Sequence, residues 1–283
     1  MSVVAVPRGA GRTGPSVRSL VGGMPPTVLL SFVIVAIVVL WALFPSLFTS
    51  HSPVTAVPAD KLLGPSSAHW FGTDYLGRDE FTRVVYGTRS SVLNAFVAVG
   101  IALIIGGSLG LVAGFVGGFV DTVIGRLVDT MLAIPPFLLA VVIVVALGFH
   151  TVNAAIAAGV ALIAIFARVM RAETLKVRHA VFVESSYLQG GSRLFVLFRH
   201  VLPNSYRSVL ALAVLELGYS IIIIAALAFL GYGSPPPAAD WGLLIAASQS
   251  YQFAPWLLYC PAAVVVITVL AINRISRWLR NSN

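Results

Sequence analysis

Charged residues are scarce in this sequence of 283 residues: Asp, Glu, Lys and Arg make up 10% of it, against about 25% in soluble domains. Cysteine is nearly absent, because Cys260 stands alone; this excludes an internal disulfide framework and a metal site of paired thiolates. The two lysines, Lys61 and Lys176, lie outside any glycine-rich phosphate-binding loop, so no such ATP site is expected. We predict no catalytic residues and no metal ligands.

Apolar residues dominate instead, with 58% hydrophobic residues and a mean hydropathy of +0.96. Crossing a bilayer takes about 20 apolar residues as helix, and lipid tolerates only helices or closed barrels. The alternating strands of a barrel are missing. We expect an all-α integral membrane protein with six transmembrane helices, at Thr27–Phe48, Ser91–Gly117, Val120–Leu147, Val152–Met170, Ser208–Leu230 and Pro255–Ile275.

The cations fix the expected orientation, since cytoplasmic loops carry an excess of Lys and Arg. With six spans, fourteen of the eighteen fall on one side, which places both termini in the cytoplasm. The net charge of +8 therefore indicates topology and contact with anionic membrane lipids, and no nucleic-acid binding, because no aromatic-basic platform accompanies it. These fourteen are Arg8, Arg12, Arg18, Arg126, Arg168, Arg171, Lys176, Arg178, Arg193, Arg199, Arg207, Arg274, Arg277 and Arg280.

The spans divide the chain into four parts. Residues 1–26 are rich in Gly, Pro, Ser and Arg and are expected to form a disordered cytoplasmic tail. The span over residues 27–48 exceeds the 7–15 apolar residues of a signal peptide, so we expect an uncleaved anchor. An extracytoplasmic loop of residues 49–90 follows. The core domain, residues 91–283, holds the other five spans and a cytoplasmic loop at residues 171–207.

That cytoplasmic loop contains a compact basic island between long apolar runs. Gly190 and Gly191 can end a helix, Ser192 can cap the next one, and Pro203 should limit it. The pattern predicts two short helices with a sharp corner between them. Aromatics beside cations suit insertion into the groove of another protein, and the alternative is a helix on the lipid headgroups. The residues concerned are Glu184, Ser185, Ser186, Gly190, Gly191, Arg193, Phe195, Phe198, Arg199, His200, Leu202 and Pro203.

The spacing of this island resembles the coupling loop of bacterial ABC importer permeases, which reads E-A-A, three residues, G, then a distant L-P. Ser185 and Ser186 stand where the family has two alanines, and they keep the small size. In that family the loop docks into a groove on a separate ATPase subunit. The resemblance implies the type I importer permease fold, a core permease domain at residues 91–283, and ATPase coupling as the role of the island.

The extracytoplasmic loop carries a second pattern, His69-Trp70-Phe71-Gly72-Thr73-Asp74-Tyr75-Leu76-Gly77-Arg78-Asp79. It closely resembles a segment of the second permease of dipeptide, oligopeptide and nickel importers. Asp74 can form an Asx turn and Gly77 a tight corner. Arg78, Asp79, Arg83 and Arg89 can then form an ion-pair lattice that holds the loop to the bundle; direct contact with substrate is the other interpretation. The motif residues are Gly72, Thr73, Asp74, Gly77, Arg78 and Asp79.

Three charged residues and a glycine stripe mark the spans themselves. Asp129 lies in the third span three residues after Arg126, so the two can form a structural ion pair or line a transport pathway. Glu216, in the fifth span, has no partner evident in the sequence. Pro135 and Pro136 should kink the third span. Gly106, Gly110 and Gly114 recur every four residues, which predicts close approach of a neighbouring helix.

The family resemblance implies the permease subunit of an ATP-driven importer in the bacterial inner membrane. Its expected partners are a sister permease, two ABC ATPase subunits or a fused pair, and an extracytoplasmic substrate-binding protein. ATP and Mg would be used by the ATPases, with no cofactor on this chain. Dipeptides, longer peptides, nickel chelates and haem are all substrates that the family allows, and peptides are the class we expect. The alternative is an ion-coupled secondary transporter that uses Asp129 or Glu216 as a proton relay.

Overall fold

The computed structural model describes residues 25–235 and 237–281, and within them the chain is helical and has no strand. Five helices are long and apolar enough to cross a membrane: Pro26–Leu43, Glu80–Val116, Thr151–Arg178, Arg193–Tyr232 and Trp256–Arg280. The expected all-α membrane fold is therefore confirmed. The predicted tail of residues 1–26 lies outside the described residues except for Pro25 and Pro26, where the first described helix, α2 (Pro26–Leu43), begins.

The third predicted span is two helices, α5 (Gly118–Leu132) and α6 (Pro136–Leu147), with an angle of 91° between them. Pro135 has extended backbone angles and α6 starts directly after it. Proline lacks the N–H that would continue the helix, so the predicted kink at Pro135 and Pro136 is confirmed. Its size was not foreseen. The pair counts as the sixth span only if both helices together cross the membrane, because α5 alone is about 22 Å long.

The other helices extend past the predicted membrane segments. A single helix covers α3 (Glu80–Ile101), a π-helical turn (Ala102–Gly106) and α4 (Gly107–Val116). It begins eleven residues before the predicted start at Ser91, because Asp79 caps it by accepting from the backbone N of Thr82 at 2.8 Å. Similarly, α7 (Thr151–Arg178) continues beyond Met170. A search for apolar runs in the sequence finds the part of a helix that lies in lipid and misses the polar ends of that helix.

The remaining elements form the two ends of the bundle and its last long helices. Helices α8 (Val181–Leu188) and α9 (Arg193–Val196) follow α7. A π-helical turn (Leu197–Val201) joins α9 to α10 (Leu202–Leu227), and a second one (Ala228–Tyr232) ends it. Short α11 (Trp241–Ala247) precedes α12 (Trp256–Asn281). Single 3-10 turns lie at Pro45–Leu47, Pro58–Asp60 and Ser248–Ser250.

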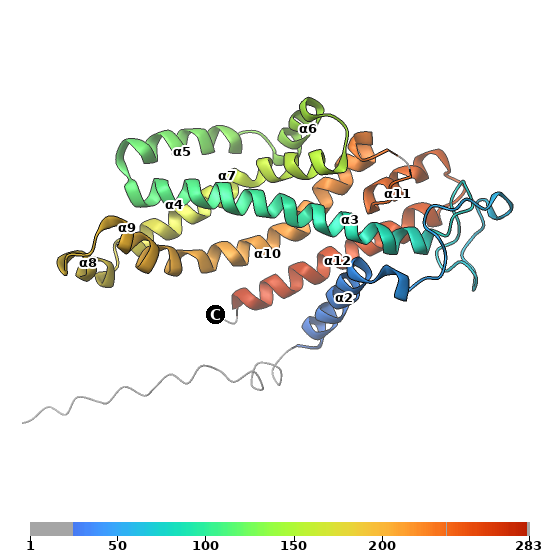
Figure 1. Cartoon of the computed structure of the whole chain (residues 1–283), viewed down its shortest axis with the longest axis horizontal. Helices are drawn as coiled ribbons and strands as arrows, with labels where there is room; N and C mark the ends of the chain where they lie inside the picture. Colours follow the sequence, from blue (N-terminus) through green and yellow to red (C-terminus); the bar gives the residue numbers. More distant parts are fainter. Residues whose placement is uncertain (1–24, 236, 282–283) are drawn as a thin grey trace, which may run out of the picture.

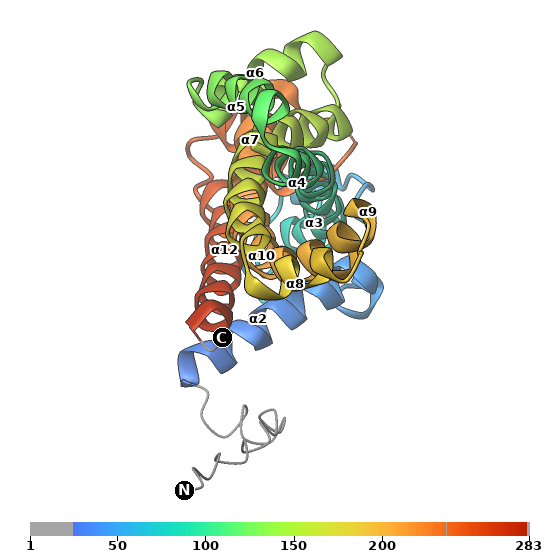
Figure 2. The same cartoon turned by 90° about the vertical axis from the view of Figure 1, so that its left-hand side faces the viewer.

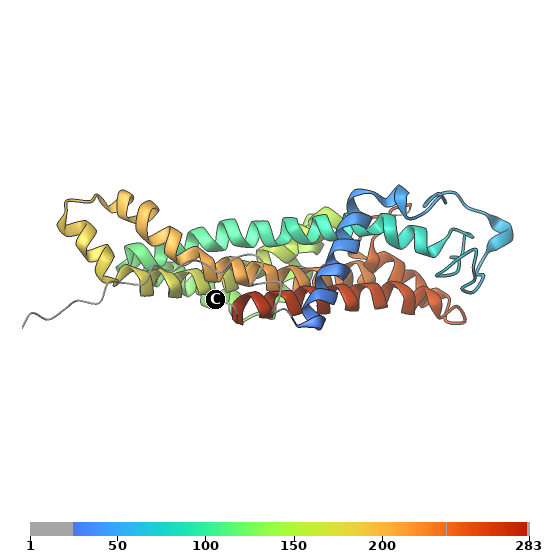
Figure 3. The same ribbon diagram turned by 90° about the horizontal axis from the view of Figure 1, so that it is seen from below.

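The bundle is elongated, and its two ends differ in character. Helices α8 and α9 lie at one end, while the loop before α3 and helix α11 lie at the other (Figure 1). Seen along the bundle, α5 and α6 occupy one edge, α2 and α12 occupy the opposite edge, and α3, α4, α7 and α10 lie between them (Figure 2). Helix α2 crosses the bundle obliquely (Figure 3). Three buried clusters form the core: α3 and α10 contribute to all three, and α7 contributes to two of them.

The glycine stripe allows α4 to approach α7, as predicted. A Cβ on Gly106 would collide with the carbonyl oxygen of Ile163, and a Cβ on Gly110 would collide with that of Ala167. On Gly114 it would come within 2.8 Å of the Thr174 Cβ. Since backbone atoms cannot rotate away, these three positions have room only for hydrogen. Close helix packing through small residues is a common way of associating helices in membranes.

Candidate functional site

The corner between α8 and α9 is the most distinctive local structure of the chain. Helix α8 ends at Leu188, and Gly190 adopts a φ of +85°, a left-handed conformation that other residues avoid. The Gly191 backbone N donates to the Ser186 carbonyl at 3.0 Å, closing the turn. Ser192 then caps α9, because its Oγ accepts from the Phe195 backbone N at 3.3 Å. The predicted helix end, corner and cap are all confirmed.

Gly191 and Ser186 must both be small because they meet at this corner. A Cβ on Gly191 would lie 2.8 Å from the Ser186 carbonyl oxygen and 2.9 Å from the Ser186 Oγ. A larger side chain at either position would push α8 away from α9. This contact gives a physical reason for small residues at this point of the loop. Ser185 differs, since its Oγ donates to the Val181 carbonyl at 2.9 Å within α8.

The helix after the corner does not end at Pro203, and this part of the prediction was wrong. The chain stays helical from Arg193 to Leu230, and Gly231 breaks the helix with a φ of +92°. The π-helical turn at Leu197–Val201 explains why, since the Leu202 backbone N donates to Leu197, five residues back. The backbone hydrogen bonds have thus already left the α-helical spacing of four residues before Pro203, whose nitrogen cannot donate. The corner therefore joins one short helix to one very long helix.

The inner side of the corner is anchored to the bundle. Val183, Val196 and Val201 are fully buried and pack with Leu111 and Phe115 of α4. Arg178, at the end of α7, donates to the Gly114 and Phe115 carbonyls at 3.1 Å. Because α4 and α7 reach the corner directly, a displacement of the corner would be passed to two long helices. The site is mechanically continuous with the spans.

The outer side of the corner leaves apolar groups uncovered, and we call it the α8–α9 surface. Leu188 is 89% exposed, and Phe195 and Phe198 are more than half exposed. Arg193, Arg199 and Glu184 are exposed among them. His200 sits against two rings, with its centroid 6.3 Å from Phe182 and 5.8 Å from Phe195. The surface comprises Val181, Phe182, Glu184, Tyr187, Leu188, Arg193, Leu194, Phe195, Phe198 and Arg199.

Sequence reasoning missed part of this surface. Leu188 and Leu194 are among its most exposed members, yet in the sequence they look like ordinary core leucines. The helical phase that turns them outward depends on where α8 ends and α9 begins. The signal available was the cap at Ser192, from which the outward face of α9 could have been counted.

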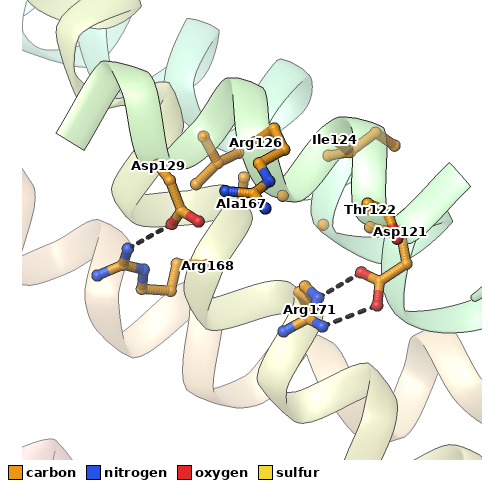
Figure 4. Close-up of a pocket in the computed structure, with 12 residues that line it drawn as sticks. Asp121, Thr122, Ile124, Arg126, Asp129, Ala167, Arg168 and Arg171 are labelled. Carbon is orange, nitrogen blue, oxygen red and sulfur yellow. Dashed lines mark hydrogen bonds and ion pairs between the residues drawn. The ribbon is translucent and has the colours of Figure 1, made fainter. Parts of the chain in front are cut away.

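The charged residues of α5 pair with α7 and not within α5. Asp129 accepts from Arg168 at 2.9 Å, and Asp121 forms a two-bond pair with Arg171 at 2.5 and 2.7 Å (Figure 4). The expected Arg126–Asp129 pair is therefore corrected, although the two are only three residues apart. Arg126 lines the same groove and makes no ion pair within the described residues. Partners 39 and 50 residues away cannot be read from a sequence.

Glu216 is buried in α10, and its Oε2 lacks a hydrogen-bond partner in the described part of the chain. Glu216 does not line the groove that contains Asp129. The two acids that the ion-coupled alternative could use therefore do not share a groove.

The two α5–α7 pairs should differ in strength, because the side chains of Asp121 and Arg171 are 20% and 43% exposed while those of Asp129 and Arg168 are 66% and 61% exposed. Double-mutant cycles with Asn and Gln should give a coupling of about 1 kcal/mol for Asp121 with Arg171. The Asp129–Arg168 cycle, the matched control, should give under about 0.5 kcal/mol. The measurement is thermal unfolding of the purified chain. Equal coupling energies in the two cycles would contradict the predicted difference in strength between the two ion pairs.

The loop before α3 is fastened by a buried charge cluster. Asp74 accepts from the Leu76 and Arg78 backbone N at 2.8 and 2.9 Å, which is the predicted Asx turn. Its carboxylate pairs with Arg78 at 2.6 Å and lies 3.6 Å from Arg83 Nε. Asp79 pairs with His69 at 2.9 Å. The lattice thus includes His69, which was not foreseen, and omits Arg89 among the described ion pairs.

The remaining motif residues hold this loop to α12 and to itself. Gly72 and Gly77 have φ values of +72° and +77°, and neither has space for a Cβ. Thr73 hydrogen-bonds to Asp60 and Leu63, and its carbonyl accepts from Trp256 Nε1 at 3.2 Å. The clamp that the motif predicts is thus present in the geometry.

The chain is similar to known proteins in both sequence and fold. The family model of the binding-protein-dependent transport system inner membrane component matches residues 106–282. The dipeptide transport system permease protein DppC of Alkalihalophilus pseudofirmus is 40% identical over 255 residues, covering 90% of this chain and 84% of that protein. The probable D,D-dipeptide transport system permease protein DdpC of Escherichia coli is 36% identical over 261 residues, covering 92% and 87%.

A third relative is the glutathione transport system permease protein GsiD of Pectobacterium atrosepticum, 38% identical over 220 residues, with coverage of 77% and 73%. Among solved structures, an inward-facing MetNI methionine ABC transporter matches with a TM-score of 0.59 at 16% identity, over 70% of this chain and 94% of that chain. An amino acid ABC transporter with histidines gives 0.52 at 15%, over 68% and 90%. These two likenesses concern the fold alone.

Proposed function

The chain belongs to the family of binding-protein-dependent transport system inner membrane components, and we propose that it couples ATP hydrolysis on partner subunits to the import of short peptides. The observation that carries the proposal is the α8–α9 surface. It combines uncovered aromatic and leucine side chains with cations on a corner that α4 and α7 support. A groove on an ATPase subunit would cover the apolar part and leave the cations at its rim.

Helix length argues that this surface lies beyond the lipid. The helix of residues 193–232 has 40 residues and is about 60 Å long, roughly twice the hydrocarbon thickness. Even with strong tilt, one end must project into water. Exposed Leu188 and Phe198 would then be costly unless a protein covers them. Docking on an ATPase is therefore favoured over a helix that rests on headgroups.

The chain carries no phosphate-binding loop of the G-x-x-x-x-G-K-[ST] kind, so ATP and Mg are assigned to partners. We propose two ATPase subunits, separate or fused, a sister permease that shares the translocation pathway, and an extracytoplasmic binding protein that delivers substrate. ATP would close the ATPase pair, and the corner would pass that movement to α4, α7 and α10. ATP can drive the change only through different affinities for the two states.

Short peptides are the substrate class that the relatives favour, because their names cover dipeptides, D,D-dipeptides and glutathione. All are small and carry charged ends and amide bonds. The ion-coupled alternative is not proposed, since Asp129 is paired with Arg168 and Glu216 does not line the groove that contains Asp129. Substrate competition assays would decide whether longer peptides, nickel chelates and haem are also transported.

Cysteine labelling tests both the orientation and the docking. In a Cys260→Ser background, Ser66→Cys should react with a membrane-impermeant maleimide from outside the cell, because its loop is extracytoplasmic in this proposal. Ser192→Cys, exposed at the corner, should react only after permeabilisation. In the purified complex the ATPases should cover it and slow its labelling at least tenfold. Labelling of Ser192→Cys in intact cells, or equal rates with and without the ATPases, would contradict the proposal.

A further inference from the structure

A cavity of about 290 Å³ with charged residues in one wall lies at the end of the bundle opposite to the α8–α9 surface. Its charged wall comes from the loop before α3 and the first turn of α3, with Asp74, Arg78, Glu80 and Arg83. The facing wall is α11, which supplies Leu243 and Leu244. These two elements lie side by side in Figure 1. In the proposed orientation this is the end that faces incoming substrate.

Glu80 places a carboxyl oxygen without a hydrogen-bond partner in the wall of this cavity. Its side chain is 1% exposed, and its Oε1 has no hydrogen-bond partner among the described residues. Arg78 is already held by Asp74 at 2.6 Å. Buried polar atoms are nearly always hydrogen-bonded, and leaving one unpaired is costly. Burial disfavours the charged form of this carboxyl group. A cationic N–H donor would stabilise the charged form and bind it most strongly, because an ionised carboxylate can only accept.

Arg83, in the same cavity wall, supplies the complementary group, a hydrogen-bond donor. Its Nε lacks a hydrogen bond and lies 3.6 Å from Asp74, while another guanidinium nitrogen donates to the Pro53 carbonyl at 3.0 Å. The wall of the cavity therefore contains a buried acceptor on Glu80 and a buried donor on Arg83, neither of which has a hydrogen-bond partner in the described part of the chain. An ammonium group and a carbonyl group on the same carbon atom fit both. That combination is the amino terminus of a peptide, whereas a lysine side chain has no such carbonyl near its ammonium.

The rim and the size of the cavity fit the same ligand. Tyr75 and Tyr251 stack with their ring centroids 5.3 Å apart and both line the cavity. Aromatic faces attract cations within about 6 Å, and Arg78 already lies 5.6 Å from the Tyr75 ring. A volume of about 290 Å³ is just below the roughly 300 Å³ at which small-molecule sites start. It has room for the first residue of a peptide, whose side chain would meet Leu243 and Leu244.

We propose that this cavity binds the free amino terminus of a transported peptide, with Glu80 accepting from its ammonium group and Arg83 donating to its first carbonyl. The inference rests on the proposed import of peptides and places on this chain a contact that selects for an unblocked amino end. Asp74 acts as a positioning residue, because its ion pairs hold Arg78 and Arg83 in place.

Binding of two small probes tests the inference directly. The whole transporter in lipid nanodiscs, without its binding protein, is titrated with Ala-Ala and with N-acetyl-Ala-Ala by saturation-transfer NMR. Ala-Ala should bind at least tenfold more tightly, because acetylation removes the charge and two donors. Glu80→Gln should abolish that preference. Asp60→Asn is the matched control, as an acid of the same loop that does not line the cavity, and it should keep the preference.

Equal binding of both probes, or an unchanged preference in Glu80→Gln, would overturn the inference. If Glu80→Gln fails to assemble, the two probes on the unaltered transporter still decide the matter, with Tyr251→Ala as the second variant expected to weaken Ala-Ala binding. Uptake of Ala-Ala with ATP is measured on the same preparation once the binding protein is added. Uptake without a preference for the free amino end removes this inference alone, whereas absent uptake removes the proposed function.

Discussion

Replacing Gly190 with valine should release the ATPases from the permease while the helices stay inserted. Gly190 has a φ of +85°, and a β-branched residue held there costs about 1–3 kcal/mol. The corner should relax to another angle and carry the α8–α9 surface away from its partner. We expect ATPase recovery in a pull-down with the tagged permease to fall at least tenfold, and peptide-stimulated ATP hydrolysis in proteoliposomes to fall with it.

Asparagine at the same position supplies the control. A Cβ on Gly190 would meet no atom within 4 Å, so strain and not crowding is the problem, and asparagine tolerates the left-handed region. Gly190→Asn should therefore keep most ATPase binding. Equal loss in both variants would show that the backbone angle is irrelevant, and full binding in Gly190→Val would remove the corner from the coupling site.

The second large effect is expected inside the membrane, at Gly110. A Cβ there would collide with the Ala167 carbonyl and lie 2.9 Å from both Met170 Cβ and the Arg171 backbone N. Gly110→Ala should push α4 off α7 at a cost of about 1–3 kcal/mol. The midpoint of thermal unfolding in detergent should fall by roughly 5 °C or more.

Gly107 gives the matched control three residues earlier on the same helix, because a Cβ there meets nothing within 4 Å. Alanine is the better helix former by about 1 kcal/mol, so Gly107→Ala should leave the midpoint unchanged or raise it slightly. A similar loss in both variants would indicate a general intolerance of α4 to substitution and would remove the close-packing explanation.

The elements that local chemistry determines were predictable from the sequence. Apolar runs gave the spans, Ser192 gave a cap, and Gly190 gave the left-handed corner. In each case the physical cause lies within a few residues. The prediction failed where a second local feature intervened. We expected Pro203 to limit a helix, but the π-helical turn before it accommodates the missing donor.

Long-range partners were beyond the sequence. Asp129 has an arginine three residues away and pairs with Arg168 on α7 instead, because α5 packs against α7. Proline explains the break between α5 and α6, but its presence alone does not give the angle of 91°. The cavity at Glu80 likewise needs α11 brought against the loop before α3.

The energy source of uptake is the most direct test of the proposed ATP-driven import. Proteoliposomes that hold this chain, the sister permease and the ATPases are supplied with binding protein and labelled dipeptide outside and with ATP inside. We expect uptake that requires hydrolysable ATP, survives a protonophore, and disappears with Gly190→Val. Uptake that proceeds without ATP and collapses when the proton gradient is dissipated would contradict it and establish an ion-coupled carrier.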